Sequence, residues 1–230
     1  MRVLVTRPET EAKATADALA RLGHQAVLTP VLRIAPLDFS APHQQFDAII
    51  FTSANAVRPG LPYASGVPIY VVGARAASAL IDHGYNPPHH VAADSKGLMQ
   101  AIGQAWPSSA KVLYIAGRDR KSDLEAFLKG LGHHVTVLIA YEAIAAEDFP
   151  TSVREDLAAG GIEAVLHFSR RSAGIFVAMM TAAGLVAQLR HMRHLCLSKD
   201  VAVPLEQVDA ADISIAAQPD EAHLLALLDG

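Results

Sequence analysis

The chain has 230 residues, of which 51% are hydrophobic and 18% charged, so it can build a substantial core and is not of the disordered class. Its net charge of −4 excludes the general basic field that holds nucleic acid. The uncharged stretch from Ala173 to Leu189 is too short for a typical membrane span and contains two glycines, which predicts a buried helix instead.

The first predicted elements are a strand at Val3–Val5, a helix and a second strand at Ala26–Leu28. Pro8 suits the first turn of a helix, where its missing N–H costs nothing. The helical period is given by Ala12, Ala16, Leu19 and Leu22, and Gly23 ends the helix.

Continuous apolar runs follow along the chain, which is typical of strands that are covered on both faces. They are Ile49–Phe51, Ile69–Val72, Val112–Ile115, Val135–Ile139, Ala164–Phe168 and Leu195–Leu197. The segment from Val57 to Val67 is short and rich in Pro and Gly, so the helix after Phe51 must be truncated. Strands that alternate with helices predict α/β architecture with parallel sheets and right-handed crossovers.

Four blocks of sequence recur in the same order, which indicates a duplicated unit. The block Arg2–Val5 matches Lys111–Tyr114 at an offset of 109, and Phe46–Ser53 matches Ile162–Ser169 at 116. The block Ile69–Gly73 matches His194–Ser198 at 125, and Val91–Ala93 matches Ile215–Ala217 at 124.

Two long irregular stretches, Ala35–Pro42 and Ala143–Pro150, follow the second strand of each copy and are interpreted as linkers between domains. Linkers at these places would make the first strand–helix–strand of the chain part of the same domain as its last part. The simpler alternative is a single cut near Ser108. Linkers of this length rarely hold two domains rigidly, so we expect a monomer with mobile lobes.

Ligands of parallel α/β sheets bind at the carboxyl ends of strands, where helix N-termini offer unpaired N–H groups. Five of the six loops that we examined at these ends carry Arg or Lys, although the chain is acidic overall. This contrast predicts a cleft between the two copies that holds a small polyanion. The loops are Thr6–Pro8, Thr52–Asn55, Gly73–Arg75, Gly117–Lys121, Ser169–Arg171 and Ser198–Asp200.

Histidine and cysteine offer no further chemistry, and no Gly-rich phosphate motif is present. The pairs His89-His90 and His133-His134 are expected to be exposed, and His167 to be a satisfied core or edge residue. Cys196 is the single cysteine, so no internal disulfide can form. We expect it to be a buried hydrophobe in a reducing cytoplasm, since no export signal is present.

Several segments of the chain form a recognisable set of motifs. The most recognisable is Asp47–Val57, a strand that ends in Phe51-Thr52-Ser53. Supporting segments are Val3–Pro8, Tyr70–Gly73, Leu113–Leu124, Val137–Glu142 and Phe168-Ser169. Together, in their order and spacing, these segments resemble the uroporphyrinogen-III synthase family.

The resemblance implies two similar three-layer α/β/α domains with parallel sheets, joined by a two-stranded linker, with the N-terminal strands packing with the C-terminal part. The expected domains are 1–35 with 145–230, and 36–144, with linker strands near 30–36 and 138–144. The implied activity is cofactor-free cyclisation of linear hydroxymethylbilane, with loss of water and inversion of the last pyrrole, to give the haem precursor uroporphyrinogen III. Expected partners are this polycarboxylate tetrapyrrole and, transiently, the preceding deaminase; neither nucleic acid nor membrane is expected.

The resemblance makes Tyr141 the weak general acid and assigns substrate binding to residues of the strand-end loops. These are Thr6, Arg7, Thr52, Ser53, Ala54, Asn55, Gly73, Ala74, Arg75, Gly117, Arg118, Arg120, Ser169, Arg170, Ser198 and Lys199. The sequence departs from the family pattern at Ala76 and Val201, where hydroxyl residues are usual. The alternatives are a non-catalytic two-lobed binding protein for an anionic small molecule, and a regulatory or interaction module.

Overall fold

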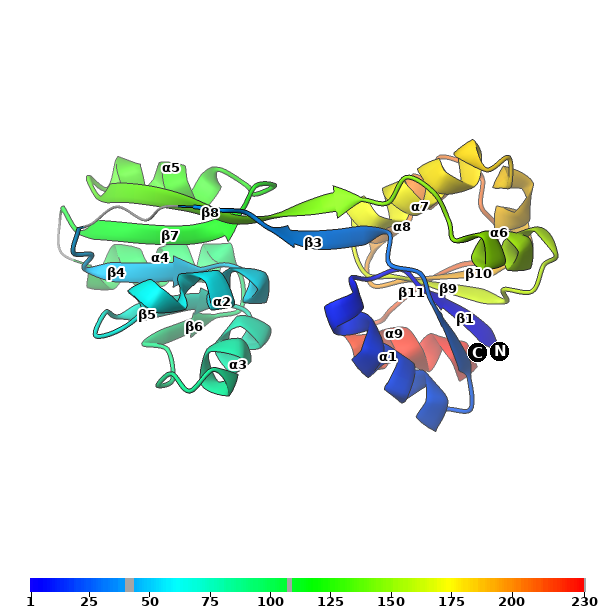
Figure 1. Cartoon of the computed structure of the whole chain (residues 1–230), viewed down its shortest axis with the longest axis horizontal. Coiled ribbons are helices and arrows are strands. Elements are labelled where there is room, and N and C mark those ends of the chain that lie inside the picture. The colour runs from blue at the N-terminus through cyan, green and yellow to red at the C-terminus, as the bar shows by residue number, and fades with distance from the viewer. Residues whose placement is uncertain (40–43, 107–108, 230) are drawn as a thin grey trace. The chain divides into compact units, whose positions relative to one another are not determined.

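The computed structural model describes residues 1–39, 44–106 and 109–229. These residues form two compact units (Figure 1). Unit 1 consists of Met1–Arg33 and Ile144–Gly230, so it holds both termini, and unit 2 is Ile34–Ala143. The sequence analysis set the corresponding limits at 35/36 and 144/145. Ser40, Ala41 and Pro42 of the expected first linker lie outside the described residues, as does Ser108, and unit 2 includes chain on both sides of Ser108.

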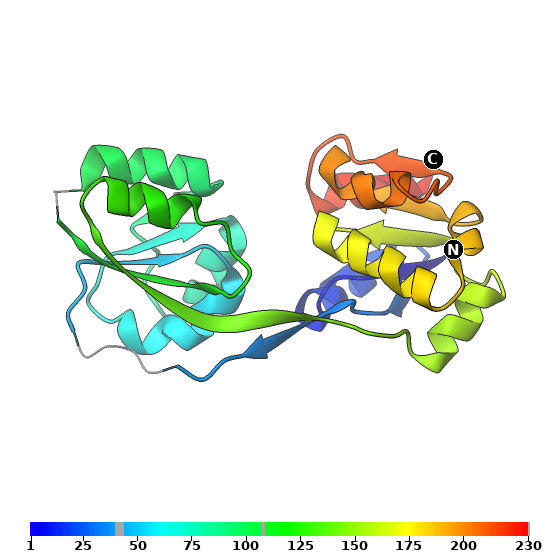
Figure 2. The same ribbon diagram turned by 90° about the horizontal axis from the view of Figure 1, so that it is seen from above.

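Unit 1 is built on a sheet of five parallel strands in the order β11-β10-β9-β1-β2. Its strands are β1 (Arg2–Val5), β2 (Gln25–Leu28), β9 (Ala164–His167), β10 (Arg193–Cys196) and β11 (Ile213–Ile215). Its helices are α1 (Glu9–Arg21), α6 (Thr151–Ala158), α7 (Arg170–Ala182), α8 (Lys199–Glu206) and α9 (Glu221–Leu225), with 3₁₀ turns at Val186–Arg190 and Ala226–Asp229. Helices cover both faces, since Val3 and Val5 pack towards α1 and α9 while Leu4 packs towards α6 and α7. Figure 2 shows α7 (yellow) beside α8 (orange).

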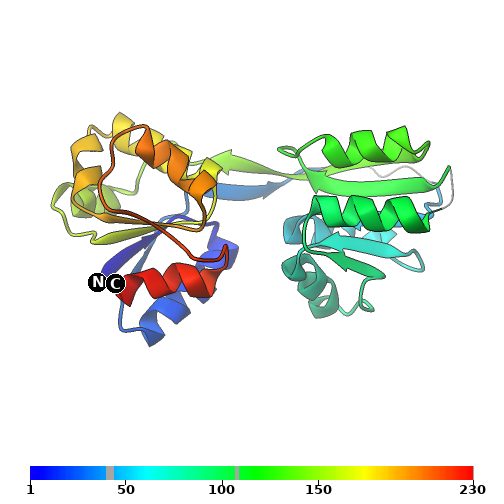
Figure 3. The same cartoon turned by 180° about the vertical axis from the view of Figure 1, so that it is seen from behind.

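Unit 2 repeats this plan around a sheet of order β3-β8-β7-β4-β5-β6. Its strands are β3 (Leu32–Pro36), β4 (Ala48–Phe51), β5 (Ile69–Val72), β6 (His90–Ala92), β7 (Lys111–Gly117) and β8 (His134–Ala145). Its helices are α2 (Val57–Gly60), α3 (Ala74–Asp82), α4 (Ser95–Ala105) and α5 (Asp123–Gly130), with 3₁₀ turns at Ala54–Ala56 and Leu61–Tyr63. The α4 and α5 helices lie side by side on one face (Figure 3), and α2 and α3 cover the other.

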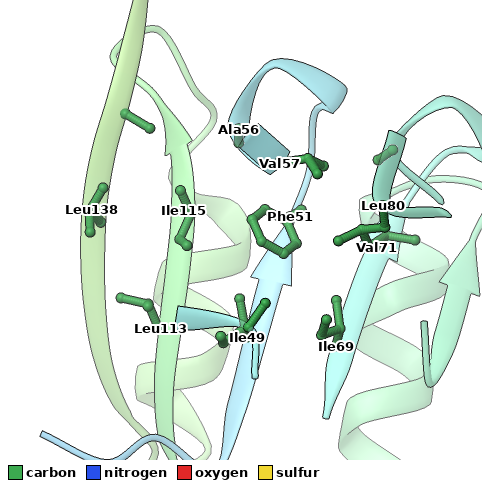
Figure 4. Close-up of a cluster of buried hydrophobic side chains, with 13 residues drawn as sticks. Ile49, Phe51, Ala56, Val57, Ile69, Val71, Leu80, Leu113, Ile115 and Leu138 are labelled. Carbon is green, nitrogen blue, oxygen red and sulfur yellow. The ribbon is translucent and has the colours of Figure 1, made fainter. Parts of the chain in front are cut away.

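Phe51 is at the centre of the main hydrophobic cluster of unit 2 (Figure 4). It is fully buried, with Ile115 and Val71 from the two neighbouring strands packed around it. Gly60 passes close to its ring, since a Cβ at Gly60 would lie 2.4 Å from Cε1 of Phe51. A longer helix with side chains at this point would collide with the ring. The helix after β4, α2, has four residues, and it is therefore as short as the Pro- and Gly-rich sequence predicted.

The strand registers of the two sheets confirm the duplication. Arg2 pairs with Gln25, and Lys111 pairs with His134, so both partners shift by 109 residues. Tyr70 pairs with His90 and Leu195 with Ser214, which reproduces the offsets of 125 and 124.

The sheets also show that the copies exchange their first strands. In the first sheet β1 pairs with β9 of the second copy, and in the second sheet β7 pairs with β4 of the first copy. The fold class predicted for the chain, with N-terminal strands packing with the C-terminal part, is therefore confirmed.

Two features differ from the expected elements. The irregular linker expected from Ala143 is still strand, because β8 continues to Ala145 and bonds to β7 on one side and β3 on the other. Leu37 N donates to Ala140 O and Ala146 N to Val31 O, so β3 and β8 run antiparallel. The expected helix over Ala173–Leu189 ends at Ala182, because Gly184 adopts a left-handed conformation with φ of 71°.

Candidate functional site

The carboxyl ends of β7, β4 and β5 are neighbours at one edge of the unit 2 sheet, since these parallel strands are adjacent in the order β7-β4-β5. A cavity of about 480 Å³ opens at this edge. The predicted residues Thr52, Ser53, Gly117, Arg120 and Tyr141 line it, together with Asp94, Ser95, Lys96, Met99, Tyr114, Asp119, Lys121, Asp123 and Leu124. The cavity is therefore made from strand ends and from the first turns of α4 and α5.

Tyr141 reaches the cavity because β8 and β7 lose their regular register between Ala116 and Gly117, which brings Gly117 opposite Tyr141. The backbone is held there by Arg118 N, which donates to Tyr141 O over 2.9 Å. The Tyr141 ring lies directly over Gly117, since a Cβ on that glycine would be 2.7 Å from Cζ and 2.9 Å from Oη. Only glycine at position 117 leaves room for the ring.

The pKa of Tyr141 is raised above its ordinary value, mainly by burial of the phenol. A hydrogen bond with the side chain of Ser53 lowers the pKa, and the nearby Tyr114 and Asp119 raise it further. The hydroxyl therefore keeps its proton at neutral pH and can act as a weak acid or as a hydrogen-bond donor.

A second pair of hydroxyls lies beside Tyr141, one from the residue after β4 and one from the middle of β7. The Thr52 and Tyr114 hydroxyls are 3.1 Å apart, and Tyr114 is buried. Ser53 begins the 3₁₀ turn after β4, where its Oγ accepts from Asn55 N over 3.2 Å. Within the Phe-Thr-Ser motif, Phe51 therefore packs in the core of unit 2, whereas Thr52 and Ser53 place their hydroxyls at the cavity.

The cavity carries both acidic and basic side chains, whereas the sequence analysis predicted mainly basic ones. Arg120 pairs with Glu125 at 3.1 Å, and Arg118, which is outside the lining, pairs with Glu142 at 3.2 Å. Three carboxylates, from Asp94, Asp119 and Asp123, belong to the lining.

Sequence reasoning missed Asp94, Ser95 and Lys96, because the loop after β6 was not among the strand ends that we considered. The same strand-end rule would have found them. Tyr114 was missed because it lies within the apolar run Val112–Ile115, which was interpreted only as a buried strand. The predicted residues Ala54, Asn55, Gly73, Ala74 and Arg75 lie at the same sheet edge, outside the cavity lining.

The corresponding edge of unit 1 gathers the ends of β10, β9 and β1, where Ser198, Ser169 and Thr6 lie. Ser169 caps α7 by accepting from Ser172 N over 3.1 Å, and Ser198 precedes α8, which Lys199 begins. Arg170 is exposed and pairs with Asp200 at 3.0 Å. Each unit thus brings its own predicted residues to one edge, and their contact with substrate stays a prediction.

Arg7 is the most constrained cation of unit 1, with 8% of its surface exposed. Its guanidinium contacts Glu11 at 2.7 Å and Glu221 at 3.1 Å, and lies 4.1 Å from the ring centroid of Phe168. Thr6 is fully buried and donates to Leu166 O over 2.9 Å. These contacts tie α1, α9 and β9 to the end of β1, and the substrate-binding role of Thr6 and Arg7 stays a prediction.

A pair of buried histidines lies below this edge. Nε2 of His194 is 2.9 Å from Leu189 O and must carry the proton, so its Nδ1 accepts from Nε2 of His167 over 3.2 Å. Nδ1 of His167 then has no partner among the described residues. His167 was expected to be a satisfied core or edge residue. It is buried, but only one of its two ring nitrogens has a hydrogen-bond partner among the described residues.

In unit 2, apolar residues occupy the two positions that correspond to these histidines. At the repeat offsets of 116 and 125, His167 corresponds to Phe51 and His194 to Ile69, both members of the main core cluster. The exposure expected for the other paired histidines is wrong for His133, which is 6% exposed and whose Nδ1 accepts from Ala110 N. Cys196 is buried as expected, and burial raises the pKa of its thiol to about 12.

We expect acid to destabilise unit 1 through the histidine pair. The pKa of His167 lies well below its ordinary value because of burial, with a smaller effect of His194, and the pKa of His194 is also lowered by burial. Below pH about 6.5 the unfolded chain binds protons that the folded chain does not, so the free energy of unfolding falls as pH falls, by roughly 1.4 kcal/mol per pH unit per histidine.

The measurement is urea unfolding followed by circular dichroism between pH 7 and 5. The double variant His167→Phe/His194→Ile, which copies unit 2, should lose less stability over this range than the parent chain. Equal acid slopes for the two proteins would contradict the prediction.

No group of three or more His, Cys, Asp or Glu side chains within residues 1–39, 44–106 and 109–229 could hold a metal ion. None of the helices described in these residues is long and apolar enough to cross a membrane.

These features define a class of protein: a duplicated, strand-exchanged α/β protein with a hydroxyl-lined cavity at the strand ends of one unit. A family model described as uroporphyrinogen-III synthase HemD matches residues 13–226. The chain belongs to the uroporphyrinogen-III synthase family, as its motifs suggested.

Solved structures agree with this fold. The structure of the uroporphyrinogen-III synthetase from Helicobacter pylori aligns with a TM-score of 0.66 and 16% identity, over 99% of this chain and 98% of that one. A mutant uroporphyrinogen III synthase from Thermus thermophilus aligns with a TM-score of 0.61 and 18% identity, over 100% and 97%. A comparison with curated protein sequences finds no match.

Proposed function

We propose that this protein is a uroporphyrinogen-III synthase, a cyclising hydro-lyase that converts linear hydroxymethylbilane to uroporphyrinogen III. Family membership supports the reaction, and the observation that carries it is Tyr141, a partly buried, protonated phenol held over Gly117 beside Ser53. A cytoplasmic setting is part of the proposal, since the single cysteine excludes an internal disulfide. The substrate would be taken over from the preceding deaminase.

The reaction needs only a weak general acid, but it needs the flexible substrate to be held in one conformation. The hydroxymethyl C–O bond breaks, and the oxygen leaves as water with a proton that Tyr141 donates. The carbon that remains bonds to the α-carbon of the last pyrrole that already carries the bridge to the preceding ring. That bridging C–C bond then breaks, and the bridging carbon bonds to the free α-carbon of the same pyrrole, which releases a proton that balances the one donated. Because the flexible chain can also close without inversion, the protein must hold one geometry, and such positioning can supply much of the rate enhancement.

Substrate binding is proposed for the polar groups at the strand ends. In unit 2, the hydroxyls of Thr52 and Ser53 and the cations of the cavity face the space where Tyr141 lies. In unit 1, Ser169, Arg170, Ser198 and Lys199 form the corresponding set at their own sheet edge. Anionic carboxylates form their strongest hydrogen bonds with such cationic and amide donors. That both sets serve one substrate stays a prediction.

The test is a coupled assay in which porphobilinogen and its deaminase generate the linear tetrapyrrole in situ. Oxidised products are then separated as isomers I and III. The proposal expects isomer III to dominate with this protein and isomer I without it. Isomer I alone in both reactions would refute synthase activity, and heat stabilisation by uroporphyrinogen without turnover would point to a binding protein.

Replacing Tyr141 with phenylalanine is expected to lower kcat several-fold to about tenfold, because the ring stays in place while the proton donor is lost. The Michaelis constant should change little, since the rest of the cavity is intact. The coupled assay at saturating substrate measures kcat. Tyr63→Phe, on the same unit but outside the cavity lining, is the matched control and should retain the parent rate. An unchanged kcat in Tyr141→Phe would remove the proposed role of this phenol.

A further inference from the structure

The cations that line the cavity of unit 2 differ in what they already contact. Arg120 is 3.1 Å from Glu125, a carboxylate that also binds Lys129 at 2.7 Å. Lys96 and Lys121 also line the cavity and are exposed, and their side chains have no hydrogen bond or ion pair with any residue that the structure describes. These two ammonium groups are therefore available to an anion without first breaking an internal contact.

The acidic residues that the structure describes in the lining form no ion pair with these lysines and have other interactions. Asp94 caps α4, where its Oδ1 accepts from Gly97 N over 2.8 Å. Asp123 lies in the first turn of α5, where the positive end of the helix dipole stabilises a carboxylate. Asp119 has an interaction of its own within the structure.

The two lysines flank the cavity from different strand ends. Lys121 follows β7 and Lys96 follows β6, and the sheet order β7-β4-β5-β6 places two strands between them. With neighbouring strands about 4.8 Å apart, the two strand ends are separated by roughly 14 Å. A large polycarboxylate, whose acid groups are spread over its periphery, can place separate carboxylates on the two lysines.

We propose that Lys96 and Lys121 are the principal carboxylate-binding side chains of the unit 2 cavity, and that each takes a different carboxylate of the same tetrapyrrole. The proposal rests on the synthase function for the identity of the ligand. It gives the lysines a larger part in binding than Arg120, whose positive charge is partly balanced by Glu125. Binding, not the chemical step, is what the lysines contribute, because the proton donor is Tyr141.

The experiment measures binding of uroporphyrin III, the stable oxidised form of the product, by the anisotropy of its fluorescence. Lys96→Gln and Lys121→Gln should each raise Kd roughly three- to fivefold, which is the upper range for exposed ion pairs, and the double variant about tenfold or more. Lys111→Gln is the matched control, since Lys111 is exposed but begins β7 at the opposite end of the strand. It should stay within about twofold of the parent Kd.

Two further readouts separate carboxylate binding from a general loss of charge. The parent Kd should rise with sodium chloride concentration more steeply than that of the double variant, and Lys96→Arg should restore most of the affinity. In the coupled assay the lysine variants should raise KM with kcat nearly unchanged.

Kd values for Lys96→Gln and Lys121→Gln that match Lys111→Gln would overturn the proposal. An active parent enzyme with unaffected lysine variants would refute this inference alone. Isomer I from every variant and from the parent would instead refute the synthase function, while porphyrin binding would still decide the role of the lysines.

Discussion

Replacing Gly117 with valine is expected to lower kcat/KM of the synthase reaction by about 100-fold. A Cβ at this position would lie 2.7 Å from Cζ of Tyr141, within the distance at which one of the two groups must move. Displacing a reacting group by about 1 Å can cost on the order of 100-fold in rate, and the added methyl groups also take space in the cavity. The effect should therefore exceed that of Tyr141→Phe, in which only the hydroxyl is lost.

The control for this variant is Gly130→Ala, at the end of α5, where an added Cβ meets nothing within 4 Å. This variant should keep parent activity and stability. Circular dichroism of Gly117→Val should match that of the parent chain, which excludes misfolding. A spectrophotometric titration of the tyrosines then reports on the surroundings of Tyr141. The pKa of Tyr141, identified by the transition that is missing in Tyr141→Phe, should fall towards its ordinary value in Gly117→Val, because the displaced phenol becomes more exposed. Parent kinetics in Gly117→Val would show that the close approach of ring and glycine is irrelevant.

Phe51→Ala is expected to destabilise unit 2 by about 3–5 kcal/mol, which is the usual cost of removing a fully buried aromatic ring. Phe51 is enclosed by Ile115, Val71 and the turn at Gly60, so the surrounding strands cannot readily close the space (Figure 4). Urea unfolding followed by the fluorescence of Trp106, the single tryptophan, reports on unit 2 because Trp106 packs against its second core cluster.

A matched control is Ile81→Ala, in α3 of the same unit, whose side chain is 52% exposed. Its effect should stay within about 0.5 kcal/mol. If Phe51→Ala cost no more than Ile81→Ala, the cluster around Phe51 would not be the main core of unit 2.

Much of this architecture could be predicted because the signals are local. Apolar runs bounded by turn residues mark buried strands, and the offsets between matching blocks reappear as residue pairs in both sheets. The strand-end rule found Thr52, Ser53 and Gly117 without knowledge of any contact, because parallel strands present their carboxyl ends at the same edge. It missed Lys96 only because one strand end was not considered.

Other features could not be predicted, since they depend on residues that are far apart in the chain. Arg7 looked like a substrate-binding cation, yet it contacts Glu221, which lies 214 residues away. The length of β8 depends on its two neighbours β7 and β3, and its irregular register at Gly117 is what turns Tyr141 into the cavity.

By itself, the sequence determined the duplication, the succession of strands and helices along the chain and the hydroxyl-bearing motif at the end of β4, because periodicity and turn chemistry act over a few residues. Only the tertiary structure decided which charges remain available and which polar groups are buried together. Arg120 and Lys121 are neighbours in the chain, but folding places Glu125 against the first and no partner against the second among the described residues. Coulomb and hydrogen-bond energies depend on distance in space, and neighbouring positions in a sequence do not specify that distance.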